Sequence, residues 1–365
     1  MKKTAFKILS LVLSVFLFTG CALERTTIAY TVYPIGFLLD RLTGGAVSSY
    51  SVQTSEIVQR AQMREDYASI LSTAAVFFHI GQLEPYYSMY AGDISAAVPQ
   101  VIDLSTLNAV YDFRRYTEVE TDGGTTYVES PYYRGDEFSL VDTDSKDLYL
   151  WMDPIAMLSM AKDIRQWLIT TYPDDAPIIE NNFESLENDL INLDAQYQAL
   201  STANVVNRRS IKFVTMTASF GNWQKTYGFQ VYPVILSKYG ALPSEAQLEI
   251  IEQRIKEDDV HYIVYEENMT ADMIALFNRV EEDLGLTRVE LSNLSSLSEN
   301  DVTSGKDYLS IMYENLAVLE TMAEERATAE ETAPAEPEAP QDQETDEEPA
   351  ETEAPEASPE ATPVS

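Results

Sequence analysis

Side chains able to do acid–base or metal chemistry are scarce in this sequence, apart from carboxylates. The 365 residues include two histidines and one cysteine. His79 ends an apolar run, where it could face a cleft, and His261 follows Asp258 and Asp259. A catalytic triad needs a histidine between a carboxylate and a nucleophile, and the sequence has no nucleophile elbow, P-loop or glycine-rich dinucleotide fingerprint. We therefore expect a binding protein and not an enzyme.

The charge balance excludes one large class of partner. Acids outnumber bases by 60 to 24, which gives a formal net charge of −36. Nucleic-acid binding relies on Lys and Arg to neutralise phosphates, so we expect no nucleic-acid partner. An acidic surface attracts cations weakly but does not identify a ligand. The single cysteine excludes an internal disulfide bond.

The N-terminal segment has the features of a secretory signal. Residues 1–20 combine three lysines with an apolar run from Ile8 to Phe18, which is too short to span a bilayer comfortably. The next residue completes Phe-Thr-Gly-Cys, which resembles a bacterial lipobox. This resemblance implies that Cys21 is lipidated, becomes the mature N-terminus and holds the protein on the outer, extracytoplasmic face of a bacterial cell membrane.

The C-terminal segment, 327–365, has a composition typical of disorder. It contains 13 acids, no base, seven prolines and no aromatic residue. Such a segment cannot bury enough apolar surface to offset the entropy lost on ordering. We predict a disordered, self-repelling tail that keeps the protein soluble.

Between these ends, apolar runs alternate with helix signals. The expected strands are 26–34, 74–81, 210–217 and 260–267. Helix boundaries are marked by a proline start and a double-glycine end (Pro34 and Gly44–Gly45), by Asp153–Pro154, and by the capping box Ser244–Gln247. Strands and helices in alternation predict parallel sheets with crossover helices.

A long helical stretch divides the chain. Apolar residues recur near the 3.6-residue period over 176–203. We therefore predict an α/β protein with two Rossmann-like lobes, 21–172 and 204–326, bridged by one rigid helix within 173–203. The polar, tyrosine-rich segment 112–146 predicts an exposed hairpin inserted in the first lobe, with its turn at 122–124.

Six segments in order carry a family resemblance. They are TVYPIGFLLDRLTGG (31–45), AAVFFHIGQLEPYY (74–87), DLYLWMDP (147–154), TASFGNWQKTYGF (217–229), LPSEAQLEIIEQRIKEDDVHYIVYEENMT (242–270) and YLSIMYENLAVL (308–319). Together they resemble the zinc/manganese-type (cluster A-I) solute-binding lipoproteins of bacterial metal ABC importers. The resemblance implies a monomer that holds its ligand in a cleft between two lobes and delivers it to an ABC permease.

The usual metal ligands of that family are replaced in this chain. The family holds its metal with about four side chains, mostly His and carboxylates, and only Glu266 keeps a carboxylate at a matching place. The other matching positions carry a phenol, a hydroxyl and amides, which are poor zinc ligands. The candidate cleft residues are Gln59, His79, Tyr149, Thr217, Glu266, and Ser292 or Asn293.

Three functions fit these observations. The first is an importer's binding lipoprotein that carries one divalent ion, Zn²⁺ or Mn²⁺, and an oxygen-rich set around Glu266, Glu267 and Tyr149 would suit Mn²⁺ or Ca²⁺. The second is the same scaffold holding an organic ligand against Trp151 and Trp223, unless these two pack in the core. The third is an adhesin-like surface lipoprotein with a vestigial cleft.

Overall fold

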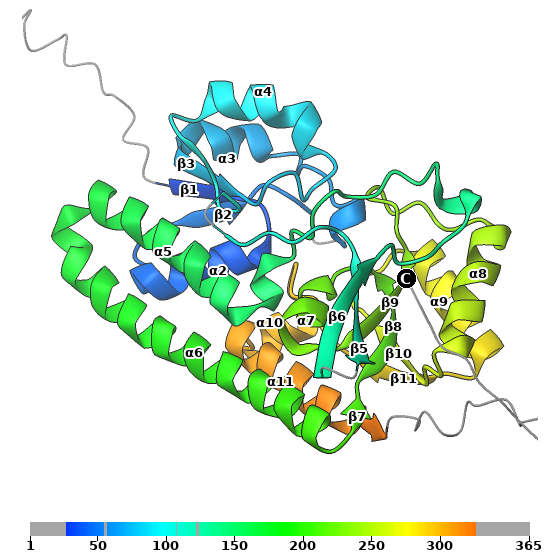
Figure 1. Ribbon diagram of the computed structural model, residues 1–365. Coiled ribbons are helices and arrows are strands. Elements are labelled where there is room, and N and C mark those ends of the chain that lie inside the picture. The colour runs from blue at the N-terminus through cyan, green and yellow to red at the C-terminus, as the bar shows by residue number, and fades with distance from the viewer. Residues whose placement is uncertain (1–26, 55–56, 107, 122–123, 326–365) are drawn as a thin grey trace, which may run out of the picture. The chain divides into compact units, whose positions relative to one another are not determined.

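The computed structural model describes residues 27–54, 57–106, 108–121 and 124–325 (Figure 1). The predicted signal, the lipidation of Cys21 and the acidic tail all lie outside these ranges. No helix within the described ranges has both the length and the apolar character that crossing a membrane requires.

The first lobe is built on a sheet of four parallel strands in the order β2-β1-β3-β4. The strands are β1 (Thr27–Tyr30), β2 (Ser49–Ser51), β3 (Ala74–His79) and β4 (Val101–Asp103). They are connected by α2 (Tyr33–Thr43), the 3-10 helix η1 (Val58–Arg60), α3 (Tyr67–Thr73) and α4 (Tyr87–Ala97). Helix α2 ends at Gly44 with φ 62°, a left-handed conformation that costs glycine little. The predicted glycine stop is confirmed.

The second lobe repeats this plan with the strand order β11-β10-β8-β9, again all parallel. Its strands are β8 (Lys212–Thr217), β9 (Gln230–Ile235), β10 (Tyr262–Tyr265) and β11 (Thr287–Glu290). Its helices are α7 (Gly221–Tyr227), α8 (Glu245–Glu257), α9 (Ala271–Leu284), α10 (Glu299–Ser304) and α11 (Tyr308–Thr321). Pro233 is tolerated in β9 because β9 is an edge strand. The capping box from Ser244 to Gln247 starts α8 as predicted.

One long helix joins the two lobes. It is α6 (Ala176–Val206), 31 residues, and it follows the 3-10 helix η4 (Pro173–Asp175). Helices α2 and α5 (Pro154–Thr171) from the first lobe and α11 from the second pack along it (Figure 1). Asp153 caps α5 by accepting hydrogen bonds from the N–H groups of Ile155 and Ala156. After α6, β7 (Arg209–Ser210) pairs with β12 (Glu324–Glu325). The bridged two-lobe prediction is confirmed.

The largest hydrophobic cluster among the described residues runs through both lobes. Trp151, in the 3-10 helix η3 (Leu150–Met152), and Trp223 both belong to it and are fully buried. Trp151 Nε1 donates to the carbonyl of Asn293 at 2.7 Å, and Trp223 Nε1 donates to the carbonyl of Met152 at 2.7 Å. The two indoles therefore tie the lobes together as core residues and do not form a wall for an organic ligand.

The segment 112–146 contains the predicted hairpin, but its base is buried. Strands β5 (Arg115–Thr121) and β6 (Gly124–Ser130) pair antiparallel, and the 3-10 helix η2 (Asp136–Phe138) follows. Tyr132 and Tyr133 join the core of the second lobe, where the Tyr133 hydroxyl donates to the carbonyl of Pro233 at 2.9 Å. Most described residues of 112–146 are exposed or half-buried, but Arg115, Tyr116, Tyr132 and Tyr133 are buried, and the two tyrosines at 132 and 133 pack onto the second sheet.

Candidate functional site

Glu266 stands at the centre of the candidate site. It follows β10, and Thr217 ends the neighbouring strand β8, so both lie at the carboxyl edge of a parallel sheet, where ligands of such folds bind. The carboxylate is fully buried. It accepts hydrogen bonds from Asn293 Nδ2 at 2.6 Å, Ser219 Oγ at 3.2 Å, the Thr217 N–H at 3.4 Å and Thr217 Oγ1 at 3.5 Å. Donors therefore surround this carboxylate. Burial nevertheless raises the pKa of Glu266 to about 7, against the lowering effect of these hydrogen bonds.

The first lobe contributes Tyr149 and Gln59. Gln59, in η1, donates from Nε2 to the Tyr149 hydroxyl at 3.2 Å. Burial raises the pKa of Tyr149 far above its ordinary value, and the nearby charge of Glu266 adds to this shift. The phenol is therefore neutral. The Oε1 atom of Gln59 is buried and has no hydrogen-bond partner among the described residues.

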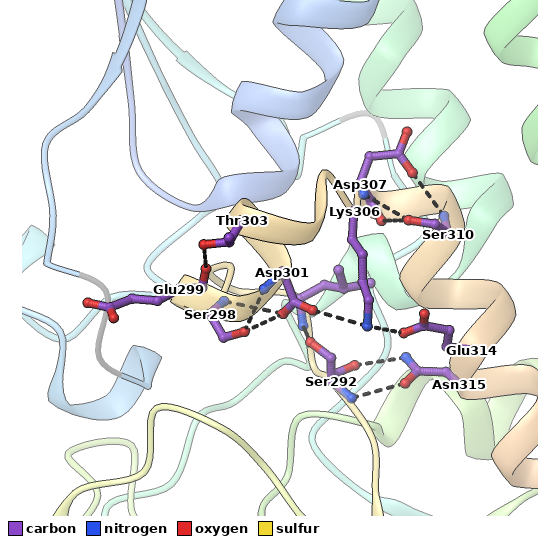
Figure 2. Close-up of polar contacts among 11 residues, drawn as sticks. Ser292, Ser298, Glu299, Asp301, Thr303, Lys306, Asp307, Ser310, Glu314 and Asn315 are labelled. Carbon is purple, nitrogen blue, oxygen red and sulfur yellow. Dashed lines mark hydrogen bonds and ion pairs between the residues drawn. The ribbon is translucent and has the colours of Figure 1, made fainter.

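The structure selects Asn293 over Ser292. Asn293 donates to Glu266, whereas Ser292 is held by Asn315 of α11, as Figure 2 shows. The Ser292 N–H donates to Asn315 Oδ1 at 3.0 Å, and Asn315 Nδ2 donates back to the Ser292 carbonyl at 2.9 Å. Ser292 thus anchors the loop that presents Asn293, and it does not bond to Glu266.

His79 lies outside the Glu266 cluster. Its Nδ1 is 2.9 Å from the carbonyl oxygen of Gly81, and its Nε2 is 3.1 Å from the hydroxyl of Tyr87. The ring stacks on Tyr87 with centroids 4.3 Å apart, and burial lowers the pKa of the imidazole. The expectation that His79 joins the cleft residues is not met, because both ring nitrogens are occupied within the first lobe. His261, which is exposed, pairs with Asp259.

Two further buried polar side chains, those of Asp147 and Asn222, form hydrogen bonds with the backbone of Tyr149. Asp147 is buried, and its Oδ1 accepts from the Tyr149 N–H at 3.2 Å and from Asn222 Nδ2 at 3.0 Å. Asn222 Nδ2 also lies 3.1 Å from the Tyr149 carbonyl. Burial raises the pKa of Asp147 to about 7. Sequence reasoning missed Asp147, Asn222 and Ser219, although Asp147 and Ser219 each lie two positions from a predicted residue.

Comparison with known proteins identifies the family. The family model described as zinc-uptake complex component A, periplasmic (ZnuA), matches residues 28–322. The chain belongs to this family. It is 30% identical over 180 residues to the zinc-binding lipoprotein AdcA of Streptococcus pneumoniae, a match that covers 49% of this chain and 34% of AdcA. The high-affinity zinc uptake system protein ZnuA of Bacillus subtilis is 27% identical over 177 residues, covering 48% of this chain and 52% of that protein. The matched region thus spans about a third of the AdcA sequence and about half of the B. subtilis ZnuA sequence.

Solved structures share the ZnuA-family fold. The periplasmic zinc-binding protein TroA of Treponema pallidum gives a TM-score of 0.64 at 14% identity, with 81% of this chain and 98% of TroA covered. Zn(II)-bound AdcA of S. pneumoniae gives a TM-score of 0.59 at 20% identity, with 81% of this chain and 57% of AdcA covered. At these identities the likeness establishes the shared fold alone.

The side chains of this ZnuA-family member differ from a conventional zinc site. Within the described ranges, no three or more His, Cys, Asp or Glu side chains are grouped so as to hold a metal ion. Zinc sites in proteins are built mostly from thiolate and imidazole ligands. The cluster instead offers one carboxylate and neutral oxygen donors, which suit harder cations.

A cavity that opens to the surface lies near this cluster. It has a volume of about 530 Å³ and runs between the Gly81–Pro85 segment, the Thr143–Lys146 segment and Lys238–Tyr239. A neighbouring space of about 10 Å³ shares several of these wall residues and reaches Gln59 and Tyr149. That volume suits about one water molecule. The Glu266 cluster is therefore closed off behind Tyr149.

Proposed function

We propose that this protein is the extracytoplasmic binding lipoprotein of a metal ABC importer. In this proposal it captures one divalent ion between its lobes, as a monomer anchored through Cys21, and delivers the ion to the permease. Membership of the ZnuA family supports the proposal. The observation that carries it is that side chains of both lobes, Gln59 and Tyr149 from one and Thr217 and Asn293 from the other, gather around Glu266.

The donor set favours Mn²⁺ over Zn²⁺ as cargo. The Glu266 carboxylate would supply the negative charge, and the unpaired Oε1 of Gln59 and the Tyr149 hydroxyl would supply neutral oxygens. Hard cations take oxygen ligands of this kind, whereas zinc gains most from sulfur and imidazole. A buried carboxylate whose lone pairs already accept hydrogen bonds must release some of them to a cation. We therefore expect modest affinity, on the order of 10⁻⁴ M, as in oxygen sites with few charged ligands.

The decisive variant is Glu266→Gln, matched by Glu267→Gln. Residues 22–365, stripped of metal, would be titrated with Mn²⁺, Zn²⁺ and Ca²⁺ by calorimetry at pH 8, where Glu266 is ionised. We expect one-to-one Mn²⁺ binding that is lost in Glu266→Gln and kept in Glu267→Gln, because Glu267 is exposed and removes the same charge elsewhere. Binding should also weaken at pH 6, since protonation of Glu266 competes with the metal.

Equal Mn²⁺ binding by both variants would contradict the proposal, because it would assign the binding to the acidic surface. The proposal would also be contradicted if the unaltered protein bound none of the three metal ions. An organic ligand or a surface partner would then become the leading function for this member of the family.

A further inference from the structure

A second cavity lies apart from the Glu266 cluster, between the base of the hairpin and α8. It has a volume of about 480 Å³ and is lined by three arginines, Arg115, Arg134 and Arg254, together with Tyr132 and Tyr133. It shares no residue with the cavity near the Glu266 cluster or with the small space at Gln59 and Tyr149. In a chain with 24 bases against 60 acids, three guanidinium groups around one hollow are unusual.

Positive charge exceeds negative charge on the inner wall of this cavity. Arg115 Nη2 donates to Asp258 Oδ2 at 2.8 Å, and Arg254 Nε donates to the same oxygen at 2.7 Å. Two guanidinium groups therefore share one carboxylate. Lys212 adds a third cation nearby by donating to the Asp258 carbonyl at 2.7 Å. Arg115 is the buried member of this pair, whereas the Arg254 side chain is 42% exposed, and both cations share one carboxylate, so a further anion would stabilise this wall.

Arg115 is a rigid component of that wall. Its side chain is 4% exposed and lies over the ring of Tyr232 at 4.3 Å, and it also donates to the Tyr232 hydroxyl. Its Nε–H is buried and has no hydrogen-bond partner among the described residues. A buried guanidinium with an unused donor is pre-organised, because it loses little further freedom when it meets an oxyanion.

The outer rim carries charges of both signs. Arg134 is exposed, and no ion pair or hydrogen bond of its side chain is found in the described part of the chain. Glu249 and Glu257, both exposed on α8, oppose it, and Glu257 accepts a hydrogen bond from Gln253 at 3.0 Å. The carboxylates of Glu249 and Glu257 disfavour an anion close to them, so a bound anion would have to lie against the arginines.

We propose that this cavity binds a small oxyanion, either phosphate or a compact carboxylate, through Arg115, Arg134 and Arg254. The planar fork of a guanidinium matches the oxygen spacing of both groups. The site is separate from the cargo cluster, so the protein would hold two ligands of opposite charge. The inference does not depend on the identity of the cargo.

The test is titration of residues 22–365 with inorganic phosphate, and in a second arm with citrate, at low ionic strength. We expect saturable one-to-one binding by calorimetry. Arg134→Ala should weaken it about fivefold, the size of one exposed ion pair. Glu249→Gln should strengthen it, because the substitution removes a negative charge that repels the anion. The arm that gives the tighter binding identifies phosphate or carboxylate as the preferred oxyanion.

Matched controls separate a site from general charge effects. Arg114→Ala removes a positive charge next to Arg115, and Glu252→Gln removes a negative charge from α8, but neither residue lines the cavity. Both should leave binding unchanged, and Glu266→Gln should as well, which keeps this result independent of the metal experiment. Absence of saturable binding to phosphate and citrate would overturn the proposal, as would equal weakening by Arg114→Ala and Arg134→Ala.

Discussion

Glu84→Gln should make the folded protein more stable at pH 8 by about 3 kcal/mol, since each pKa unit corresponds to about 1.4 kcal/mol. Glu84 is 1% exposed, and neither of its carboxylate oxygens has a hydrogen-bond partner among the described residues. Burial therefore raises its pKa from 4.5 to about 7. Glutamine has nearly the same shape and carries no charge to desolvate.

The pH dependence fixes the sign of this effect. A raised pKa means that the folded state prefers the protonated acid, so the cost is absent below pH 4.5 and complete above about pH 7. Urea unfolding of both proteins should therefore give nearly equal stabilities at pH 4 and a growing advantage for Glu84→Gln up to pH 8. Glu65→Gln, at an exposed position, is the matched control and should show no such trend. A variant less stable than the parent at pH 8 would contradict the expected desolvation cost of the ionised Glu84.

Trp151→Ala should lower the free energy of unfolding by about 3–5 kcal/mol, the range for removing a large buried aromatic side chain. Trp151 is fully buried, and its Nε1 bond to the Asn293 carbonyl joins η3 to the loop that presents Asn293. Its own carbonyl accepts a hydrogen bond from the Tyr308 hydroxyl at 2.6 Å, which links the same point to α11. The substitution leaves a cavity where the two lobes meet and removes the hydrogen-bond donor of the Asn293 carbonyl.

Urea denaturation followed by far-UV circular dichroism measures this loss. Trp167→Ala is the matched control, because Trp167 is only partly buried and its indole N–H bonds to the exposed side chain of Gln100. We expect the control to cost clearly less. Trp151→Phe should recover part of the packing but not the bond to Asn293. Equal losses for Trp151→Ala and Trp167→Ala would show that the contact between the lobes contributes little to stability.

Local signals in the sequence were sufficient for the central strands, for several of the helices and for their order. Asp153 caps α5, Ser244 begins a capping box and Gly44 ends α2, and each signal acts over three or four neighbouring residues. The same holds for α6, whose apolar period spans the helix and ends three residues beyond the predicted boundary. The edge strands β2, β4, β9 and β11 escaped prediction: β2, β4 and β11 have only three or four residues, which carry too little pattern, and Pro233 interrupts β9.

Family matching located most of the residues around Glu266, and the packing of side chains determined which candidates belong to that cluster. Gln59, Tyr149, Thr217, Glu266 and Asn293 were all candidates, and all five lie in the bonded cluster around Glu266 and Tyr149. The choice of Asn293 over Ser292, and the exclusion of His79, depended on side-chain direction. A strand or loop residue can turn either way, and only its neighbours in space determine which way it turns.

The sequence by itself determined two lobes of parallel strands, a bridging helix and a cleft set poor in metal ligands. Only the tertiary structure placed Tyr132 and Tyr133 in the core of the second lobe and brought Arg115 onto Asp258. The physical reason is the range of the forces involved. Capping and periodicity act between neighbours in the chain, whereas burial and ion pairing join residues more than a hundred positions apart, such as Arg115 and Asp258.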